Sequence, residues 1–460
     1  MSCRSLLASA VTGGAVVFAV PAASQQADGQ GTILTARISS SAEADDNYSL
    51  SDTSPGNAFL WNNTLSLGIS SATPIASLSG QVSGVLRFAD LPVTGTETDL
   101  DDGTVNLAYQ RAIDDSSFAF NLFANDADVQ FLDPLNFIND DGSFDDTSGT
   151  GRRTLVRGDF ALELNGDGPI RFALTGRASD TSYYDTNGGT GLSDRETEEL
   201  TATVGFDTTE TAEIYVEANG YNDERGNGND TQSASLRVGT KADVSPVTTI
   251  DANIGYQQVD TDYDDGSSKT RDGLVGALKL TRDLANGSAF ASASSTNYAG
   301  GDKTDLMVGR ELETPTGSFS GQVGASITSL SDASPIFQLA YATAGPTSQF
   351  NISLDQDVSL NDNFNDQLNL NLNASYRQLI NPTSSFTLSA LAGRRQDLES
   401  EYDDNSLSRL TLLASYDQDI TRDWSVSTGL RHRTRVEDNG GDASSNSVFF
   451  TLTRSFSARR

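Results

Sequence analysis

Cysteine and histidine are almost absent from this chain, which has one of each, Cys3 and His432, in 460 residues. Cys3 lies in a segment that we expect to be removed, so the mature chain would hold no thiol. Disulfides, thiolate metal sites and cysteine nucleophiles are then excluded. The single histidine leaves no histidine cluster, and no Gly-rich phosphate loop occurs. We therefore expect no bound metal and no cofactor.

Positive charge and long apolar runs are also scarce. The chain has 30 Lys and Arg against 63 Asp and Glu, a formal net charge of −33, which argues against nucleic acid as a partner. Beyond the N-terminal segment, no run approaches the ~18 apolar residues of a transmembrane helix. The mean hydropathy of −0.36 is typical of a soluble protein. A membrane barrel can have an equally low mean hydropathy, because only half of its strand residues face lipid.

The N-terminus predicts export. Arg4 precedes the apolar run LLASAVTGGAVVFAV, and the small residues PAAS follow it. A basic start, a short apolar stretch and a small-residue exit are typical of a secretory signal peptide, here residues 1–24. We expect residues 25–31 to form a short periplasmic segment ahead of the first strand.

Apolar and polar residues alternate in residues 367–376 (QLNLNLNASY). Because successive side chains of a strand point to opposite faces, one face of this strand is apolar and the other is polar. A soluble β-sandwich shows this pattern with its apolar face toward a core. A membrane barrel shows it with lipid outside and water inside.

Similar runs recur from residues 32–40 to residues 447–456, and their connections decide between these folds. Short connections, such as 71–74 and 421–423, alternate with long ones, such as 126–151 and 437–446; residues 330–334 are an exception. Outer-membrane barrels have short periplasmic turns and long external loops. We predict an all-β, antiparallel, up-and-down transmembrane barrel of about 22 strands, with a range of roughly 18 to 24. It would span residues 32–456 with a tail of residues 457–460, and we expect no plug domain.

The C-terminal run SVFFTLTRSF, with Val448, Phe450, Leu452 and Phe456 in one register, resembles the last strand of Gram-negative outer-membrane β-barrel proteins. The resemblance implies that Phe456 is a recognition signal for the barrel-assembly machinery. It also implies outer-membrane lipids and lipopolysaccharide as neighbours. The chain departs from the family in the four residues after Phe456 and in Arg454, which takes a lipid-side position usually held by an aromatic.

Charged residues line the predicted inner faces of the last strands. They could set a transverse field across a pore, or they could be paired wall charges that keep the wall from collapsing. The candidate pore-lining residues are Arg377, Arg395, Arg409, Asp417, Asp419, Arg431, Arg433 and Arg435.

The long connection of residues 126–151 contains an apolar cluster of Phe131, Leu132, Leu135, Phe137 and Ile138. Five apolar side chains in a surface loop need something to pack on. We predict a constriction loop that folds into the lumen, as the third loop does in the porin-like proteins that the chain resembles. A lid over neighbouring loops and a partner-binding tip are the alternatives.

These features predict an outer-membrane channel for passive or weakly selective passage of small polar solutes. The alternatives are an export conduit for a polymer such as an exopolysaccharide, which Tyr215 and Tyr221 could contact, and a closed surface barrel or adhesin. A Ser–His–Asp triad needs its histidine within reach of a serine on the lumen or loop side. His432 has the parity that faces outward, so we expect that the protein is not an enzyme. Acidic external loops could bind divalent cations, although solubility of the loops is the better explanation.

Overall fold

The computed structural model describes residues 31–136, 148–187, 189–190, 192–361, 364–398, 406–438 and 440–459. The predicted signal peptide, Phe137 and Ile138 lie outside the described residues. Among the described residues, no helix is both long and apolar enough to cross a bilayer.

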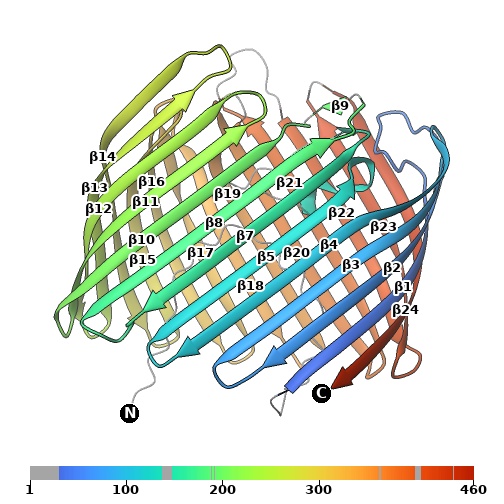
Figure 1. Ribbon diagram of the computed structural model, residues 1–460, viewed down its shortest axis with the longest axis horizontal. Coiled ribbons are helices and arrows are strands. Elements are labelled where there is room, and N and C mark those ends of the chain that lie inside the picture. The colour runs from blue at the N-terminus through green and yellow to red at the C-terminus, as the bar shows by residue number, and fades with distance from the viewer. Residues whose placement is uncertain are drawn as a thin grey trace.

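Twenty-two strands form one antiparallel sheet in which each strand pairs with the next along the chain, and β1 pairs with β24 to close the barrel (Figure 1). The barrel strands are β1 (Gly31–Asp45), β2 (Ala58–Ala72), β3 (Ala76–Leu91), β4 (Gly95–Ile113), β5 (Ser116–Asp128), β7 (Arg152–Leu164), β8 (Ile170–Tyr184), β10 (Arg195–Thr209), β11 (Ala212–Arg225), β12 (Asp230–Ser245), β13 (Thr248–Asp262), β14 (Ser268–Leu284), β15 (Gly287–Tyr298), β16 (Gly301–Thr314), β17 (Gly317–Thr328), β18 (Ser334–Ala344), β19 (Ser348–Leu360), β20 (Asp366–Asn381), β21 (Ser384–Asp397), β22 (Ser406–Asp419), β23 (Trp424–Glu437) and β24 (Asp442–Arg459). The predicted all-β antiparallel barrel of about 22 strands is confirmed.

Four short elements lie in the described parts of the connections. The 3₁₀ turns η1 (Val129–Phe131) and η2 (Pro134–Asn136) follow β5, and β6 (Ser148–Gly149) pairs with β9 (Gly189–Thr190). One end of the barrel carries two-residue turns, such as the turn between β4 and β5, and the other end carries the longer connections. By the rule for outer-membrane barrels, the end with the longer connections is external.

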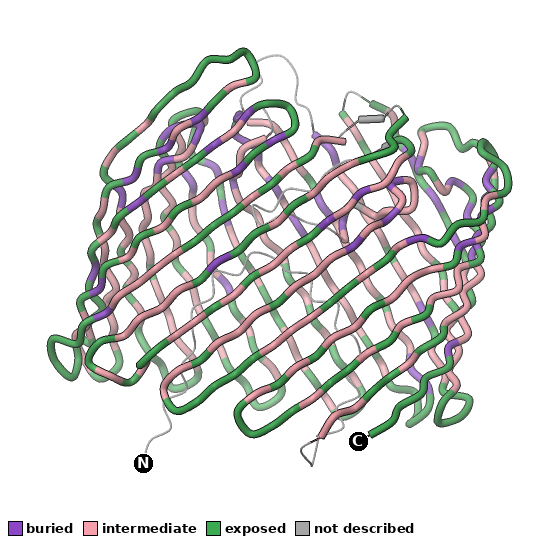
Figure 2. Tube along the Cα trace, in the orientation of Figure 1, coloured by how far each residue is buried: buried purple, intermediate pink, exposed green. Residues whose placement is uncertain are grey.

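The burial pattern is inverted relative to a soluble protein. Asn369 and Asn371 are 1% and 5% exposed, whereas Leu274 and Leu430 are 74% and 63% exposed. Polar residues therefore face the interior and apolar residues face outward, and buried residues gather toward the external end (Figure 2). A closed barrel with an apolar exterior needs hydrocarbon around it, so the protein lies in the outer membrane.

Some predicted external loops are strand rather than loop. The sequence pattern also predicts a long connection over residues 90–103, but β3 extends to Leu91 and β4 begins at Gly95, so only a short turn remains. The hairpin of β13 and β14 is extended in the same way. Alternating hydrophobicity marks only the part of a strand that meets lipid, whereas the backbone ladder continues into water among polar side chains.

Candidate functional site at the outer mouth of the lumen

The strand register places all eight candidate pore-lining residues on the lumen-facing parity. Arg409 lies opposite Arg435, Thr411 opposite Arg433, and Leu413 opposite Arg431 on β22 and β23. Arg377 and Arg395 share this parity through β21, as do Asp417 and Asp419 on β22. Their placement is thus as expected, and their role in transport stays a prediction.

The arginines of β23 are paired with carboxylates. Arg433 Nη2 lies 3.0 Å from Asp45 Oδ2, and Arg431 Nη1 lies 2.9 Å from Glu43 Oε1 of β1. Arg435 Nε lies 2.9 Å from Glu437 Oε1. The side chain of Asp45 is fully buried and also accepts from Ser445 Oγ. The pairs of Arg431 and Arg433 cross the closing seam of the barrel, so they hold the wall together as well as lining it, whereas the pair of Arg435 lies within β23.

Residues 129–136, named here the first strap, leave the wall after β5 and dock on a distant wall. Leu135 is 1% exposed and packs against Leu407 of β22 and Leu391 of β21. Thr411 Oγ1 donates to Asp133 Oδ2 at 3.0 Å. Six strands, β4, β3, β2, β1, β24 and β23, separate β5 from β22 along the wall. The strap therefore crosses part of the lumen.

Two aromatic residues and two arginines form a stack, named here the mouth stack, beside the first strap. The guanidinium of Arg87 lies 3.8 Å from the ring centroid of Phe131. The Phe131 ring lies 5.3 Å from that of Tyr48, and the guanidinium of Arg433 lies 5.4 Å from the Tyr48 ring. Burial raises the pKa of Tyr48 above its usual value, so the phenol stays neutral. Cation–ring contacts of this kind gain strength where water is excluded.

Leu132, the remaining described member of the predicted apolar cluster, lines a cavity of about 90 Å³. Tyr48 and Arg409 lie on the same cavity. Phe131, Leu132 and Leu135 thus all face the lumen side of the mouth. The role of the first strap as a constriction stays a prediction.

A second inward segment, named here the second strap, comprises Asn361 and residues 364–366 between β19 and β20. Phe364 is 5% exposed, with the Arg225 guanidinium 4.9 Å from its ring and the Tyr263 ring 5.7 Å away edge-on. Arg225 Nη1 also donates to the Asn361 carbonyl at 2.8 Å. Seven strands, β12 to β18, separate β11 from β19 along the wall.

Asp366 anchors the second strap at its base. Its side chain accepts hydrogen bonds from Tyr298 and Ser331, both at 2.7 Å, and from Thr328. Sequence reasoning missed this strap, because only one aromatic stands in the polar stretch NDNFND. The available signal in the sequence was Phe364 itself, a large apolar residue in a polar turn. In the structure its backbone adopts a φ of 60°, which non-glycine residues rarely adopt.

Most of the positive charge of the chain lines the lumen. The ion pairs between β1 and β23 show which residues of these two strands face inward. The strand register then gives the inward positions of every other strand. The inward cations are Arg37, Arg87, Arg153, Arg157, Arg171, Arg177, Arg195, Arg225, Arg237, Lys241, Lys269, Arg271, Lys279, Lys303, Arg377, Arg395, Arg409, Arg431, Arg433 and Arg435. The acidic excess therefore lies on the turns, the external connections and the outward face.

His432 lies on the outward parity, as expected. Its Nδ1 is 2.9 Å from Asn446 Oδ1, and Asn446 Nδ2 donates to Asp46 Oδ2 at 2.9 Å. In the described part of the chain, no three His, Cys, Asp or Glu side chains are grouped so that they could hold a metal ion.

No protein-family model matches the sequence, and no curated protein matches it. Solved structures do resemble the fold. The FrpB iron transporter from Neisseria meningitidis aligns with a TM-score of 0.57 at 8% identity, over 94% of this chain and 82% of that one. The siderophore receptor PirA from Acinetobacter baumannii aligns with a TM-score of 0.52 at 9% identity, over 93% and 81%. A mutant of the ferric enterobactin receptor PfeA from Pseudomonas aeruginosa aligns with 0.51 at 9%, over 93% and 82%.

These likenesses correct the predicted function. The similar structures are named as an iron transporter, a ferric enterobactin receptor and a siderophore receptor, not as porins, so the prediction of passive passage of small polar solutes is wrong. A polar lumen and an apolar exterior are common to both kinds of barrel, and this is why the sequence pattern did not separate them. The strand number does separate them, because porins have about 16 to 18 strands. The similar structures are named as a transporter and receptors, not as enzymes. This fits the expectation that the chain is not an enzyme, which stays a prediction.

Proposed function

We propose that this barrel is an outer-membrane receptor that captures an anionic ligand at its external mouth and takes it up through the lumen. The observation that carries the proposal is the external mouth itself, where two straps reach across a lumen lined by cations and by the carboxylates paired with them. A diffusion pore needs an unobstructed path, whereas a receptor needs groups that hold a ligand and elements that move when it arrives.

The proposed ligand class is an anionic metal chelate. The similar structures are named for iron, for a siderophore and for ferric enterobactin. The chain has a net charge of −33, yet most of its Lys and Arg face the lumen, so the lumen is far less negative than the exterior. That distribution favours an anion inside the barrel over an anion at its surface.

The first strap is the proposed moving part. Known 22-stranded outer-membrane transporters close their lumen with a plug. In this chain we propose that the two straps narrow the outer mouth, and that the predicted constriction residues Phe131, Leu132 and Leu135 belong to that gate. The first strap docks through one buried leucine, one hydrogen bond and the mouth stack, contacts that are few enough to break on ligand binding.

Ligand binding by the full chain in detergent tests the proposal. Titration calorimetry with ferric catecholate and ferric hydroxamate chelates would show saturable binding of the anionic complex, weakened by salt. The same chelators without iron and an uncharged sugar serve as controls. Cells that depend on this barrel would accumulate the iron complex in a manner that a protonophore abolishes. No saturable binding of any anionic chelate, together with uptake that is unaffected by the protonophore, would overturn the proposal.

A further inference from the structure

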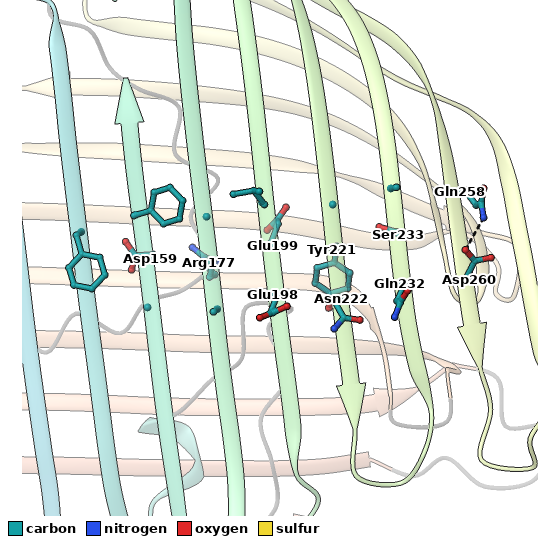
Figure 3. Close-up of a pocket in the computed structure, with 18 residues that line it drawn as sticks. Asp159, Arg177, Glu198, Glu199, Tyr221, Asn222, Gln232, Ser233, Gln258 and Asp260 are labelled. Atoms are coloured by element: carbon teal, nitrogen blue, oxygen red, sulfur yellow. Dashed lines mark hydrogen bonds between the residues drawn. The ribbon is translucent and has the colours of Figure 1, made fainter. Parts of the chain in front are cut away.

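A groove of about 880 Å³ lies in the wall formed by β5, β7, β8, β10, β11, β12 and β13 (Figure 3). Phe120 pairs across the strands with Phe160, Phe160 with Gly176, and Gly176 with Leu200. These residues have the parity opposite to that of the inward-facing Asp223 and Arg225. The groove therefore opens on the exterior of the barrel, toward lipid.

The floor of the groove has little side-chain cover. Gly158, Gly220 and Ala234 line it, and a Cβ added to Gly220 would meet no atom within 4 Å. One wall is aromatic: the Phe160 ring lies where a side chain on Gly176 would stand. The result is a groove that is open along its length. Its floor lies at the glycines, and larger side chains form its walls.

Polarity changes from one end of the groove to the other. Phe120, Phe160 and Leu200 line the apolar end. Glu198, Asn222, Gln232 and Asp260 line the other end, within a few residues of the external ends of β10 to β13. Asn222 Nδ2 donates to Glu224 Oε1 at 3.1 Å and Asp260 accepts from Gln258 and Thr270, whereas the side chains of Glu198 and Gln232 are exposed. An apolar channel that ends in amide and carboxylate groups matches an amphiphile that lies along the wall.

A second exterior groove, of about 600 Å³, lacks this polar end. Leu388, Ala390, Leu412 and Leu430 line it, and its polar lining residues of outward parity are Tyr376, His432 and Asn446, none of them a carboxylate. These groups are already hydrogen-bonded, Tyr376 to Gln378 and Asn446 to His432 and Asp46. This groove can accept an acyl chain, but it has few free hydrogen-bonding groups for a lipid headgroup. It therefore serves as an internal control.

We propose that the larger groove binds one uncharged glycolipid, with an acyl chain on the glycine floor and sugar hydroxyls at the exposed side chains of Glu198 and Gln232, because the acidic rim would repel a phosphate. The face lies in hydrocarbon, so its occupant is a lipid or another membrane protein. A two-fold contact with a second copy would place the acidic rims of both copies together, which is unfavourable. Apolar contact alone gives no preference among lipids, so selectivity comes from the hydrogen bonds at the rim.

Lipid retention by the full-length barrel tests this site. The barrel is purified into nanodiscs with equal amounts of an uncharged glycolipid and phosphatidylethanolamine, and native mass spectrometry counts the lipids that remain. We expect one retained glycolipid on the wild type and none on Gly220→Leu, which fills the floor where space is open. Ala390→Leu, in the second groove, should retain it. Gln232→Ala should weaken retention about threefold, the loss expected for one hydrogen bond within a membrane.

Three results would overturn the site. These are equal retention by the wild type and Gly220→Leu, equal retention of the two lipids by the wild type, and a dimer that Gly220→Leu converts to a monomer. Heat-modified mobility on gels confirms that each variant is a folded barrel, so that loss of lipid is not mistaken for loss of fold.

Discussion

At the residue scale, the outer mouth depends on a few buried side chains that belong to distant parts of the chain. Tyr48 comes from the connection after β1, Phe131 from the first strap, and Arg433 from β23, yet the three stack on one another. Each contributes through its ring face or its cation, so truncating any one of them loosens the first strap without removing a strand.

Phe131→Ala should free the first strap. The change removes one ring contact and one cation–ring contact, which together are worth about 2 kcal/mol. Hydrogen exchange of residues 129–136 would become faster, while exchange in β5 and β7 stays unchanged. Tyr48→Phe, which keeps the ring and its neutrality, is the matched control and should leave the strap protected.

Asp45→Ala should destabilise the closing seam. The buried carboxylate offsets Arg433, and leaving that guanidinium without Asp45 costs about 3 kcal/mol. Urea unfolding of the barrel in lipid vesicles measures the loss. The double variant Asp45→Ala with Arg433→Met should regain most of the stability, because it removes both charges. A double variant as unstable as the single one would show that the pair does not act as a unit.

At the element scale, the strands follow from the sequence and the straps do not. Alternating residues such as those of β20 repeat every two positions, so a local pattern is enough to find them. The docking of Leu135 on Leu407 joins residues far apart in the chain, and no local pattern encodes that contact. The apolar cluster of residues 131–138 showed only that the segment packs on something.

Leu135→Asp should undock the first strap. A carboxylate placed against Leu391 and Leu407 loses its water without gaining a partner. In planar bilayers the variant should show frequent open events, while the wild type is mostly closed. Leu413→Asp is the matched control, because it introduces the same charge on the lumen parity of β22 but away from η2. Leu200→Asp would not serve, because Leu200 faces lipid. Identical recordings for Leu135→Asp and the wild type would exclude the strap as a gate.

At the scale of the whole molecule, closure of the barrel depends on the pairing of β1 with β24. Ala36 lies opposite Phe456, and hydroxyl pairs join Ser39 to Thr453 and Ser41 to Thr451. Arg454, out of place in a lipid-facing register, lies 5.2 Å from the Trp424 ring and 4.5 Å from the Phe456 ring. Its charge is thereby held between two aromatic faces near the end of the strand.

Phe456→Ala should reduce the amount of assembled barrel. The family resemblance makes this residue a signal for the assembly machinery, and its ring also covers Arg454. Heat-modifiable barrel in isolated outer membranes should fall severalfold relative to the wild type. Phe450→Ala removes an outward aromatic from the same strand and should leave assembly near normal. Equal loss in both variants would point to lipid contact, not to recognition.

The sequence by itself determined on which face of the wall each strand residue lies, because a period of two depends only on the local backbone. It placed the eight candidate pore residues on the lumen parity and His432 on the lipid parity. Tertiary structure alone decided which residues meet across the lumen, since those contacts depend on where 22 strands close and on how wide the ring is. The straps that cross the lumen join residues far apart in the chain, and no local pattern encodes where they dock.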